Sequence, residues 1–329
     1  MNPQISSWIQ SFLAADPPRS KSLVVTIFGD SIAPHGGAAW LGSLIELLGP
    51  FGVNERLVRS SVFRLAEEGW IEAERHGRRS EYRLTASGSK RFEQAYRKIY
   101  VRPSSSWDGH WTIVFAGLGT VDGDRRTSLR RELLWEGFRP LSPLTFARPG
   151  GNSDALLEIL ERTNTRKQVV VCNAREPERF FARPLSSLIA KRWNLNPIGS
   201  AYRRFIRSFQ KLAELLASTE ALDPEQSFVV RTLLIHAFRR VLLHDPLLPV
   251  ELLPDSWRGN DAYELCRSIY RLACPGAEQH LLNVLGREGT EPSAAADYFY
   301  ERFGGLTRQC RSGESTVDRT IAFQIQPPA

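Results

Sequence analysis

The sequence predicts a mainly helical α+β protein with three domains. Three observations support this fold class: a basic helix followed by a short hairpin, a middle region in which apolar strands alternate with helices, and a C-terminal region of long amphipathic helices. They predict a winged helix-turn-helix domain at 20–100, a ferredoxin-like βαββαβ domain at 107–183 and a helical domain at 184–310. A chain of 329 residues is long enough for two or three domains.

The N-terminal region consists of short helices separated by proline and glycine. Residues 1–19 are expected to form a loosely attached helix that ends at Asp16. The first helix of the winged domain is predicted from Lys21 to Ile32, and residues 34–37 interrupt it. A second helix is predicted at 38–48, followed by a turn before the next helix.

Residues 54–69 have the spacing of an amphipathic helix. Asn54 is a favourable N-cap residue, and Gly69 ends the helix. At about 100° per residue, apolar positions fall on one side and polar positions on the other. The apolar side comprises Leu57, Val58, Ser61, Val62 and Leu65, and the opposite side comprises Arg56, Arg59, Ser60, Phe63 and Glu67, with Arg64 on the flank.

A hairpin is predicted directly after this helix. Residues 70–75 form a strand, residues 76–78 turn, and residues 80–84 return with period-two alternation. Thr85 then caps a helix at 86–100, which a linker follows. A helix that fits the major groove beside a basic hairpin is the arrangement of a winged helix-turn-helix domain on duplex DNA.

Both elements carry side chains suited to DNA. An arginine on a recognition helix can hold the O6 and N7 atoms of guanine, so Arg56 and Arg59 are the candidates for base recognition. Ser60 can bond a base or a phosphate, and Phe63 either touches a thymine methyl or packs on a neighbouring element. The hairpin arginines suit phosphate contacts. The candidate DNA-binding residues are Asn54, Arg56, Arg59, Ser60, Phe63, Arg64, Arg75, Arg78, Arg79, Tyr82 and Arg83.

The positive charge of the chain is concentrated in this region. The whole chain has 43 Lys and Arg against 36 Asp and Glu, a net charge of +7. Residues 54–102 hold 12 Lys and Arg against 7 Asp and Glu, a net charge of +5. The alternative interpretation is a solvated helix face, but concentrated positive charge next to a basic hairpin favours a polyanionic partner.

The middle region alternates strands and helices. Asp122 and Asp124 are expected to cap its first helix, whose positive end favours carboxylates. Paired across a dimer, they would instead hold Mg²⁺ for phosphodiester cleavage. The predicted elements are a strand at 110–118, a helix from Asp122 or Asp124 to Glu136, strands at 138–141 and 144–147, a helix opened by Asn152 or Ser153, and a buried strand at 168–172.

Strand signals stop after Pro184. Amphipathic helices are predicted at 197–217, 224–243 and 260–285, and the residues after Gly286 are expected to fray. Arginines lie beside aromatic residues on the first two of these helices, either as a solvated face over core aromatics or as a site for an anionic ligand. The candidate ligand-binding arginines are Arg203, Arg204, Arg207, Arg239 and Arg240.

Other kinds of site find little support in the sequence. Cys172, Cys266, Cys274 and Cys310 lack paired CxxC spacing, so buried reduced thiols are expected. No Walker loop or complete nucleophile motif occurs, so we expect no catalytic residue, no metal and no cofactor. No segment reaches the roughly 18 to 20 apolar residues of a membrane helix, and the N-terminus does not resemble a secretory signal, so a cytoplasmic protein is expected.

Three parts of the chain have long and specific sequence patterns. They are FGDSIAPHGGAAWLGSLIELLGPFGVNERLVRSSVFRLAEEGWIEAERHGRRSEYRLTASG at 28–88, WDGHWTIVFAGL at 107–118, and HDPLLPVELLPDSWRG at 244–259 with AYELCRSIYRL at 262–272. In these patterns the chain resembles the PaaX-type transcriptional repressors of phenylacetic acid catabolism. The resemblance spans roughly residues 20 to 310, in one order and without large gaps.

The resemblance implies a function and partners that composition and spacing do not. The winged domain would bind a palindromic operator as a homodimer, and the middle domain would be similar to the Cas2 ferredoxin-like fold and help the dimer form. An aromatic acyl-CoA effector, phenylacetyl-CoA, would release the DNA. Two rivals stay open: a Mg²⁺-dependent phosphodiesterase that uses Asp122, and an acyl-CoA-binding module that acts without DNA.

Overall fold

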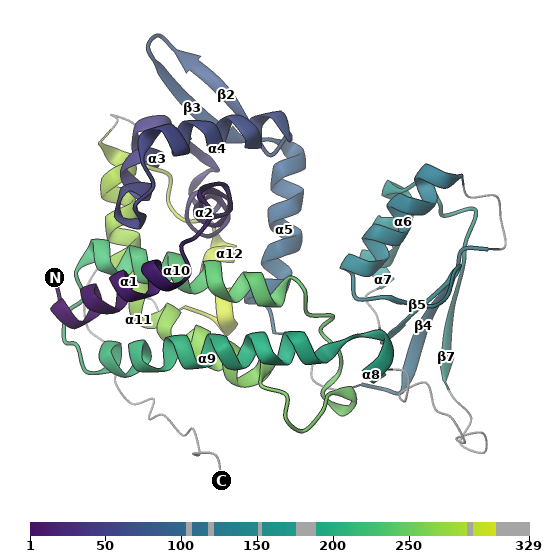
Figure 1. The fold of residues 1–329 in the computed structure, drawn as a ribbon. Coiled ribbons are helices and arrows are strands. Elements are labelled where there is room, and N and C mark those ends of the chain that lie inside the picture. Colours follow the sequence, from purple (N-terminus) through teal and green to yellow (C-terminus); the bar gives the residue numbers. More distant parts are fainter. Residues whose placement is uncertain (103–106, 118–121, 151–152, 176–188, 288–291, 307–329) are drawn as a thin grey trace. The chain divides into compact units, whose positions relative to one another are not determined.

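The computed structural model of the protein describes residues 1–102, 107–117, 122–150, 153–175, 189–287 and 292–306 (Figure 1). Contacts within the chain divide it into two units. Unit 1 comprises Met1–Val101, Ile206–Arg239 and the described residues from Tyr263 onward, and unit 2 comprises Arg102–Phe205 and Arg240–Ala262. Each unit therefore combines segments that lie far apart in the sequence.

Three helices form the N-terminal core of unit 1. They are α2 (Ser20–Ile27), α3 (Leu41–Leu48) and α4 (Glu55–Glu67), and α4 packs against both of the others. Burying one such aliphatic side chain contributes about 1.5–3 kcal/mol. The buried side chains are Leu23, Val24 and Ile27 of α2, Leu44, Leu47 and Leu48 of α3, and Val58, Val62 and Leu65 of α4. The predicted first helix continues past α2, but as a π-helical turn at Phe28–Ile32.

A three-stranded antiparallel sheet lies beside these helices, in the order β1-β3-β2. The predicted hairpin is present as β2 (Ile71–His76) and β3 (Arg79–Leu84). The prediction of a helix from residue 38 is wrong at its start. Ala38–Trp40 forms β1, which pairs with β3, because the sheet supplies its backbone bonds before the helix begins at Leu41. α5 (Ala86–Tyr100) follows the hairpin with Thr85 as its N-cap, as predicted.

The N-terminal helix α1 (Pro3–Ala15) is firmly packed in unit 1, so the expectation of a loose attachment is wrong. Ile5 and Ile9 are buried, and the rings of Trp8 and Phe12 both pack on Phe209 of α9. The error arises because the partner surface is supplied by residues about 200 positions away, which local sequence does not show.

The rest of the chain consists mainly of long helices, whose segments Ile206–Arg239 and from Tyr263 onward belong to unit 1. They are α9 (Leu195–Ala217), α10 (Pro224–Leu242), α11 (Gly259–Gly286) and the short α12 (Asp297–Tyr300). The three predicted amphipathic helices are thus present. The expectation that the residues after Gly286 fray is wrong for α12, where Phe299 is buried. Within the described residues, none of the helices is both long enough and apolar enough to cross a lipid bilayer.

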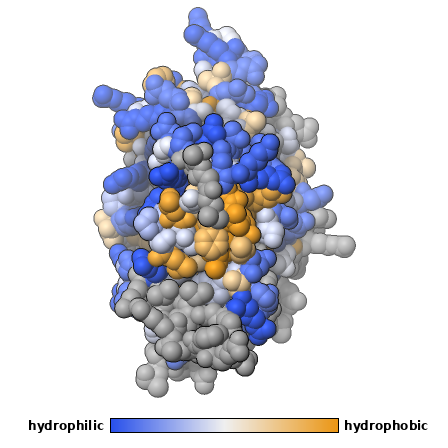
Figure 2. All heavy atoms as spheres, turned by 90° about the vertical axis from the view of Figure 1, so that its right-hand side faces the viewer, coloured by the Kyte–Doolittle hydropathy of each residue, from blue (hydrophilic) through white to orange (hydrophobic). Residues whose placement is uncertain are grey.

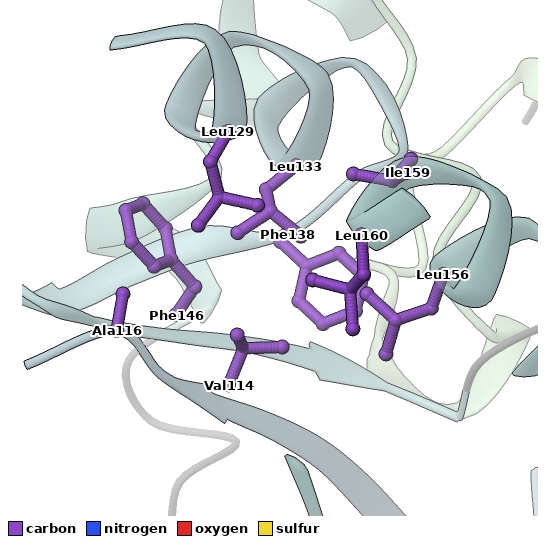
Figure 3. Packing of buried hydrophobic residues seen from close by; sticks show 9 residues of the cluster. All are labelled: Val114, Ala116, Leu129, Leu133, Phe138, Phe146, Leu156, Ile159 and Leu160. Carbon is purple, nitrogen blue, oxygen red and sulfur yellow. The ribbon is translucent and has the colours of Figure 1, made fainter. Parts of the chain in front are cut away.

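Unit 2 contains a four-stranded antiparallel sheet in the order β5-β6-β4-β7. Two helices cover one face of this sheet, and their apolar side chains meet those of β4 and β6 in one cluster (Figure 3). The elements are β4 (His110–Phe115), α6 (Gly123–Trp135), β5 (Arg139–Ser142), β6 (Thr145–Pro149), α7 (Ser153–Arg162) and β7 (Val170–Arg175), in the predicted strand and helix order.

The other face of this sheet is partly covered by α8 (Ile189–Arg192) and Trp193, whose indole donates to the carbonyl oxygen of Gly137 at 3.1 Å. β7 is an edge strand, so the prediction of a buried final strand is wrong: Val170 and Val171 are 43% and 41% exposed. Cys172 is exposed too, so the expectation of a buried thiol is wrong there; Cys266 and Cys274 are buried as expected, and Cys310 lies outside the described residues. Figure 2 shows hydrophobic residues gathered in one patch on the face that it presents.

Candidate nucleic-acid interface

The helix α4 begins as the sequence predicts. The Asn54 side chain accepts a hydrogen bond from the Leu57 backbone N–H at 3.0 Å, which satisfies one of the orphan amides of the first turn. Val58 and Val62 anchor the helix in the core. Leu57 is an exception to the predicted apolar side, since it is 46% exposed.

One face of α4 carries the candidate DNA-binding side chains of the helix. They lie at spacings of three and four, which place them in one row on an α-helix. Phe63 is 61% exposed, an unusual environment for a large apolar ring on a charged helix. All members of the row are exposed: Arg56, Arg59, Ser60, Phe63 and Arg64.

Arg59 has an acidic partner that the sequence analysis did not single out. Its Nε and Nη2 atoms donate to Glu55 Oε1 at 2.8 and 2.6 Å, one turn earlier on the same helix. Both side chains are more than half exposed, so water screens the pair and a stronger anion can replace the carboxylate. The sequence does contain the pattern that indicates this pair, a glutamate followed four residues later by an arginine on one helix.

The hairpin presents its arginines on both faces. Successive side chains of a strand point to opposite sides, so Arg79 and Arg83 share one face while Arg75 and Tyr82 share the other. Arg78 lies in the turn next to Gly77, whose φ of +62° suits glycine. All four arginines are exposed and Tyr82 is half-buried. Arg75, Arg78 and Arg79 therefore place positive charge around the tip of the hairpin, here called the finger. Arg83 lies nearer the base and donates to Glu81 at 2.8 Å.

Tight contacts fix the base of the hairpin against α4 and α5. The Thr85 hydroxyl donates to the carbonyl oxygen of Gly69 at 2.7 Å, and the Thr85 backbone N–H donates to that of Trp70 at 3.2 Å. A side chain on Gly88 would place its Cβ 2.0 Å from the carbonyl oxygen of Trp70. The close approach requires glycine, and it sets where the hairpin leaves the helical core. Figure 1 shows the hairpin extending from the core beside α4.

The ligand-binding candidates do not form one uniform group. Arg203, Arg204, Arg207 and Arg240 are exposed. The guanidinium of Arg239 instead donates to Thr26 and to the Ser22 carbonyl and hydroxyl oxygens at 2.7–2.9 Å, which joins α10 to α2.

The two aspartates of unit 2 lie at the start of α6. Asp122 is the N-cap residue, and its Oδ1 accepts from the Arg125 backbone N–H at 2.8 Å. Asp122 also pairs with the Arg125 side chain at 3.1 Å, and Asp124 lies in the first turn. The predicted capping role of Asp122 is confirmed.

Comparison with known proteins connects these regions to one family. The model described as PaaX-like protein matches residues 19–88, that of the PaaX protein central Cas2-like domain matches 104–182, and that of the PaaX-like protein C-terminal domain matches 193–283. A solved structure of an uncharacterized protein from Mycobacterium tuberculosis has a TM-score of 0.47 and 24% sequence identity, and covers 79% of this chain and 97% of its own.

A curated relative is similar over nearly the whole chain. It is the transcriptional repressor PaaX of Escherichia coli strain K12, which is 35% identical over 304 residues, 92% of this chain and 96% of the relative. The three family models together match the parts of this chain that hold the basic helix and the hairpin, the Cas2-like region and the C-terminal helices. This chain belongs to the PaaX family.

Proposed function

We propose that this chain is a cytoplasmic, DNA-binding transcriptional repressor of an aromatic-acid catabolic operon, of the phenylacetate type. The observation that carries the proposal is the exposed row on α4, held on an N-capped, core-anchored helix beside a cationic finger. Arginine at such a row can bond guanine edges in the major groove, while the finger contacts phosphates. The curated relative, named as a transcriptional repressor, supports the same role.

Residues 20–100 would form the winged helix-turn-helix domain, with α4 as recognition helix and β2–β3 as wing. Residues 107–183 would form a ferredoxin-like domain, which the βαββαβ element order and the antiparallel order β5-β6-β4-β7 support. Residues 184–310 would be the effector-responsive helical region. A homodimer would place two recognition helices in successive major grooves of a palindromic operator, about one helical turn apart.

The effector in this proposal is an aromatic acyl-CoA, phenylacetyl-CoA. Exposed arginines on α9 and α10, Arg203, Arg204, Arg207 and Arg240, supply charge for its phosphates. Arg239 contributes less, because its guanidinium already holds α2. The effector can release DNA only by as much as its affinities for the two states of the protein differ.

A mobility-shift titration tests the proposal. The probe is a palindromic promoter fragment from an aromatic-acid catabolic operon, without and with phenylacetyl-CoA. We expect a specific complex of the protein with the probe, and we expect phenylacetyl-CoA to dissociate this complex. Mg²⁺-dependent cleavage of the probe that Asp122→Ala abolishes would support a phosphodiesterase instead. Thioester binding that added operator DNA leaves unchanged would support a DNA-independent acyl-CoA module.

A further inference from the structure

A C-terminal segment lies across the N-terminal elements of unit 1. Residues 293–306, here called the strap, include α12. The backbone N–H of Ala296 donates to the carbonyl oxygen of Pro34 at 2.9 Å. On the other side, the hydroxyl of Tyr96 in α5 donates to the carbonyl oxygen of Tyr298 at 2.6 Å. The strap therefore joins the turn after α2 to the helix that leaves the hairpin.

Arg302 of the strap is fully buried. Its Nη1 donates to the Asp30 carbonyl oxygen at 2.8 Å and to the Tyr270 hydroxyl at 2.7 Å. Its guanidinium carbon lies 4.2 Å from the ring centroid of Tyr100 and 4.6 Å from that of Phe299. Burial by itself would lower the pKa of Arg302, but Tyr270, Tyr100 and Asp30 outweigh it and raise the pKa, so the side chain stays charged.

Asp30 is the acceptor that the surrounding groups share. Its carboxylate accepts from the hydroxyls of Tyr100 at 2.6 Å and Tyr270 at 3.1 Å, and lies 3.1 Å from Arg231 Nε of α10. Arg231 also pairs with Glu278 of α11. We call Asp30, Arg231, Glu278 and Arg302 the buried charge cluster; all four are at most 7% exposed in their side chains.

The cluster holds the far ends of the two helices that support the candidate interface. Asp30 lies in the π-helical turn that continues α2, and α2 packs on α4. Tyr100 ends α5, which begins at Thr85 directly after the hairpin. The two helices approach closely, since a Cβ on Gly29 would lie 2.7 Å from the ring of Phe92. Because α2 packs on α4 and α5 directly follows the hairpin, the distance between α2 and α5 contributes to the distance between α4 and the hairpin, together with the Thr85 and Gly88 contacts at the hairpin base.

Stability alone is a weak reason for such a cluster. Each buried ion loses several kcal/mol of hydration, and a well-packed apolar substitute is often equally stable. The charged side chains add hydrogen bonds that form in one geometry only, and these bonds fix the relative positions of the helices that they join.

We propose that Arg302 is a positioning residue for operator binding. Through Asp30 and Tyr100 it fixes α2 relative to α5, and thereby the spacing at which α4 and the hairpin meet DNA, although Arg302 itself touches no DNA. The inference rests on the proposed function, because it assigns Arg302 a role within operator binding.

The variant Arg302→Met of the full chain tests the proposal, since methionine keeps the apolar contacts and removes the directed bonds. Its binding is measured on a short duplex that the wild-type protein selects from a random library, and on an unrelated duplex of equal length. We expect affinity for the selected duplex to fall about tenfold. Affinity for the unrelated duplex and its salt dependence stay unchanged, because the phosphate-contacting arginines remain.

A charge-balanced double variant distinguishes an effect on the positions of the helices from an effect on the stability of the fold. Asp30→Asn with Arg302→Met leaves the Arg231–Glu278 pair as a neutral cluster, so the midpoint of thermal unfolding recovers while affinity for the selected duplex stays low. Arg166→Met is the matched control, an exposed arginine with one glutamate partner.

Two outcomes overturn the positioning role. One is unchanged operator affinity in Arg302→Met, and the other is recovery of affinity together with thermal stability in the double variant. If the wild-type protein selects no duplex at all, the proposed function fails. This result differs from the two outcomes above, in which the wild-type protein binds a selected duplex.

Discussion

Unit 1 contains two sets of arginines whose surroundings differ. On α4 and the hairpin, the guanidinium groups are exposed, and Arg59 pairs with an equally exposed glutamate. In the buried charge cluster, Arg231 and Arg302 are fully buried and bonded from several sides. Exposed pairs contribute about 0–1 kcal/mol, whereas breaking a buried pair costs about 3–5 kcal/mol. In the proposed function the exposed set would therefore exchange its partners for DNA, while the buried set fixes the packing of the helices.

The largest expected effect is on folding. Arg231→Met removes the cation that joins Asp30 to Glu278, so the free energy of unfolding should fall by about 3–5 kcal/mol in denaturant titrations. Arg166→Met, which breaks one exposed pair, should change it by less than about 1 kcal/mol. Equal effects of the two variants would remove the distinction between the two sets.

The second-largest expected effect is a loss of stability in acid, through the buried charge cluster. Burial raises the pKa of Glu278, but Arg231 and His35 outweigh it and lower the pKa from 4.5 to about 2. Because the folded-state pKa is the lower one, this carboxylate stabilises the fold above pH 4.5 and loses its contribution as the pH falls towards 2. The loss is about 3 kcal/mol, measurable by denaturation across that range. In Glu278→Gln the free energy of unfolding should depend less on pH over this range. The same pH dependence in the variant and the wild-type protein would contradict this role of Glu278.

Arg59→Ala should act on DNA rather than on folding. Loss of a bidentate contact to guanine should cost about 1–3 kcal/mol on the operator and relax base preference at one position. Operator titration and a repeat of the duplex selection measure both effects. Unchanged affinity would show that α4 is not the recognition helix.

Arg78→Ala should weaken every duplex alike. Its place at the tip of the finger suits a phosphate, so the slope of log affinity against log salt should fall by about 1 while base preference stays the same. Binding to operator and unrelated duplexes over a series of salt concentrations gives this slope. A change confined to the operator would mean that the finger reads bases.

Glu55→Gln should have the smallest effect, and a favourable one. It frees Arg59 from its carboxylate, so operator affinity should rise by about twofold. Glu67→Gln removes the same charge from the other end of α4 and serves as the control. An equal gain in both variants would attribute the effect to net charge rather than to release of Arg59.

Local patterns predicted the helices and the hairpin that carry the candidate interface. Asn54 and Thr85 cap their helices as expected, and the hairpin turns where glycine permits a positive φ at Gly77. These features depend on neighbours within a few residues, so spacing reveals them. β1 escaped prediction because its three residues are strand only by pairing with β3, and α1 was misjudged because Phe209 lies so far along the chain.

The sequence alone determined the row of arginines on α4, the charge of the finger and the order of elements in the middle region, because each depends only on the types and spacing of residues close together in the chain. Only the tertiary structure decided that α10 and the strap pack against the N-terminal elements and bring Arg231 and Arg302 to Asp30. The physical reason is that a buried ion pair forms between residues some 200 to 270 positions apart, and its geometry depends on how whole helices pack rather than on any neighbouring residue.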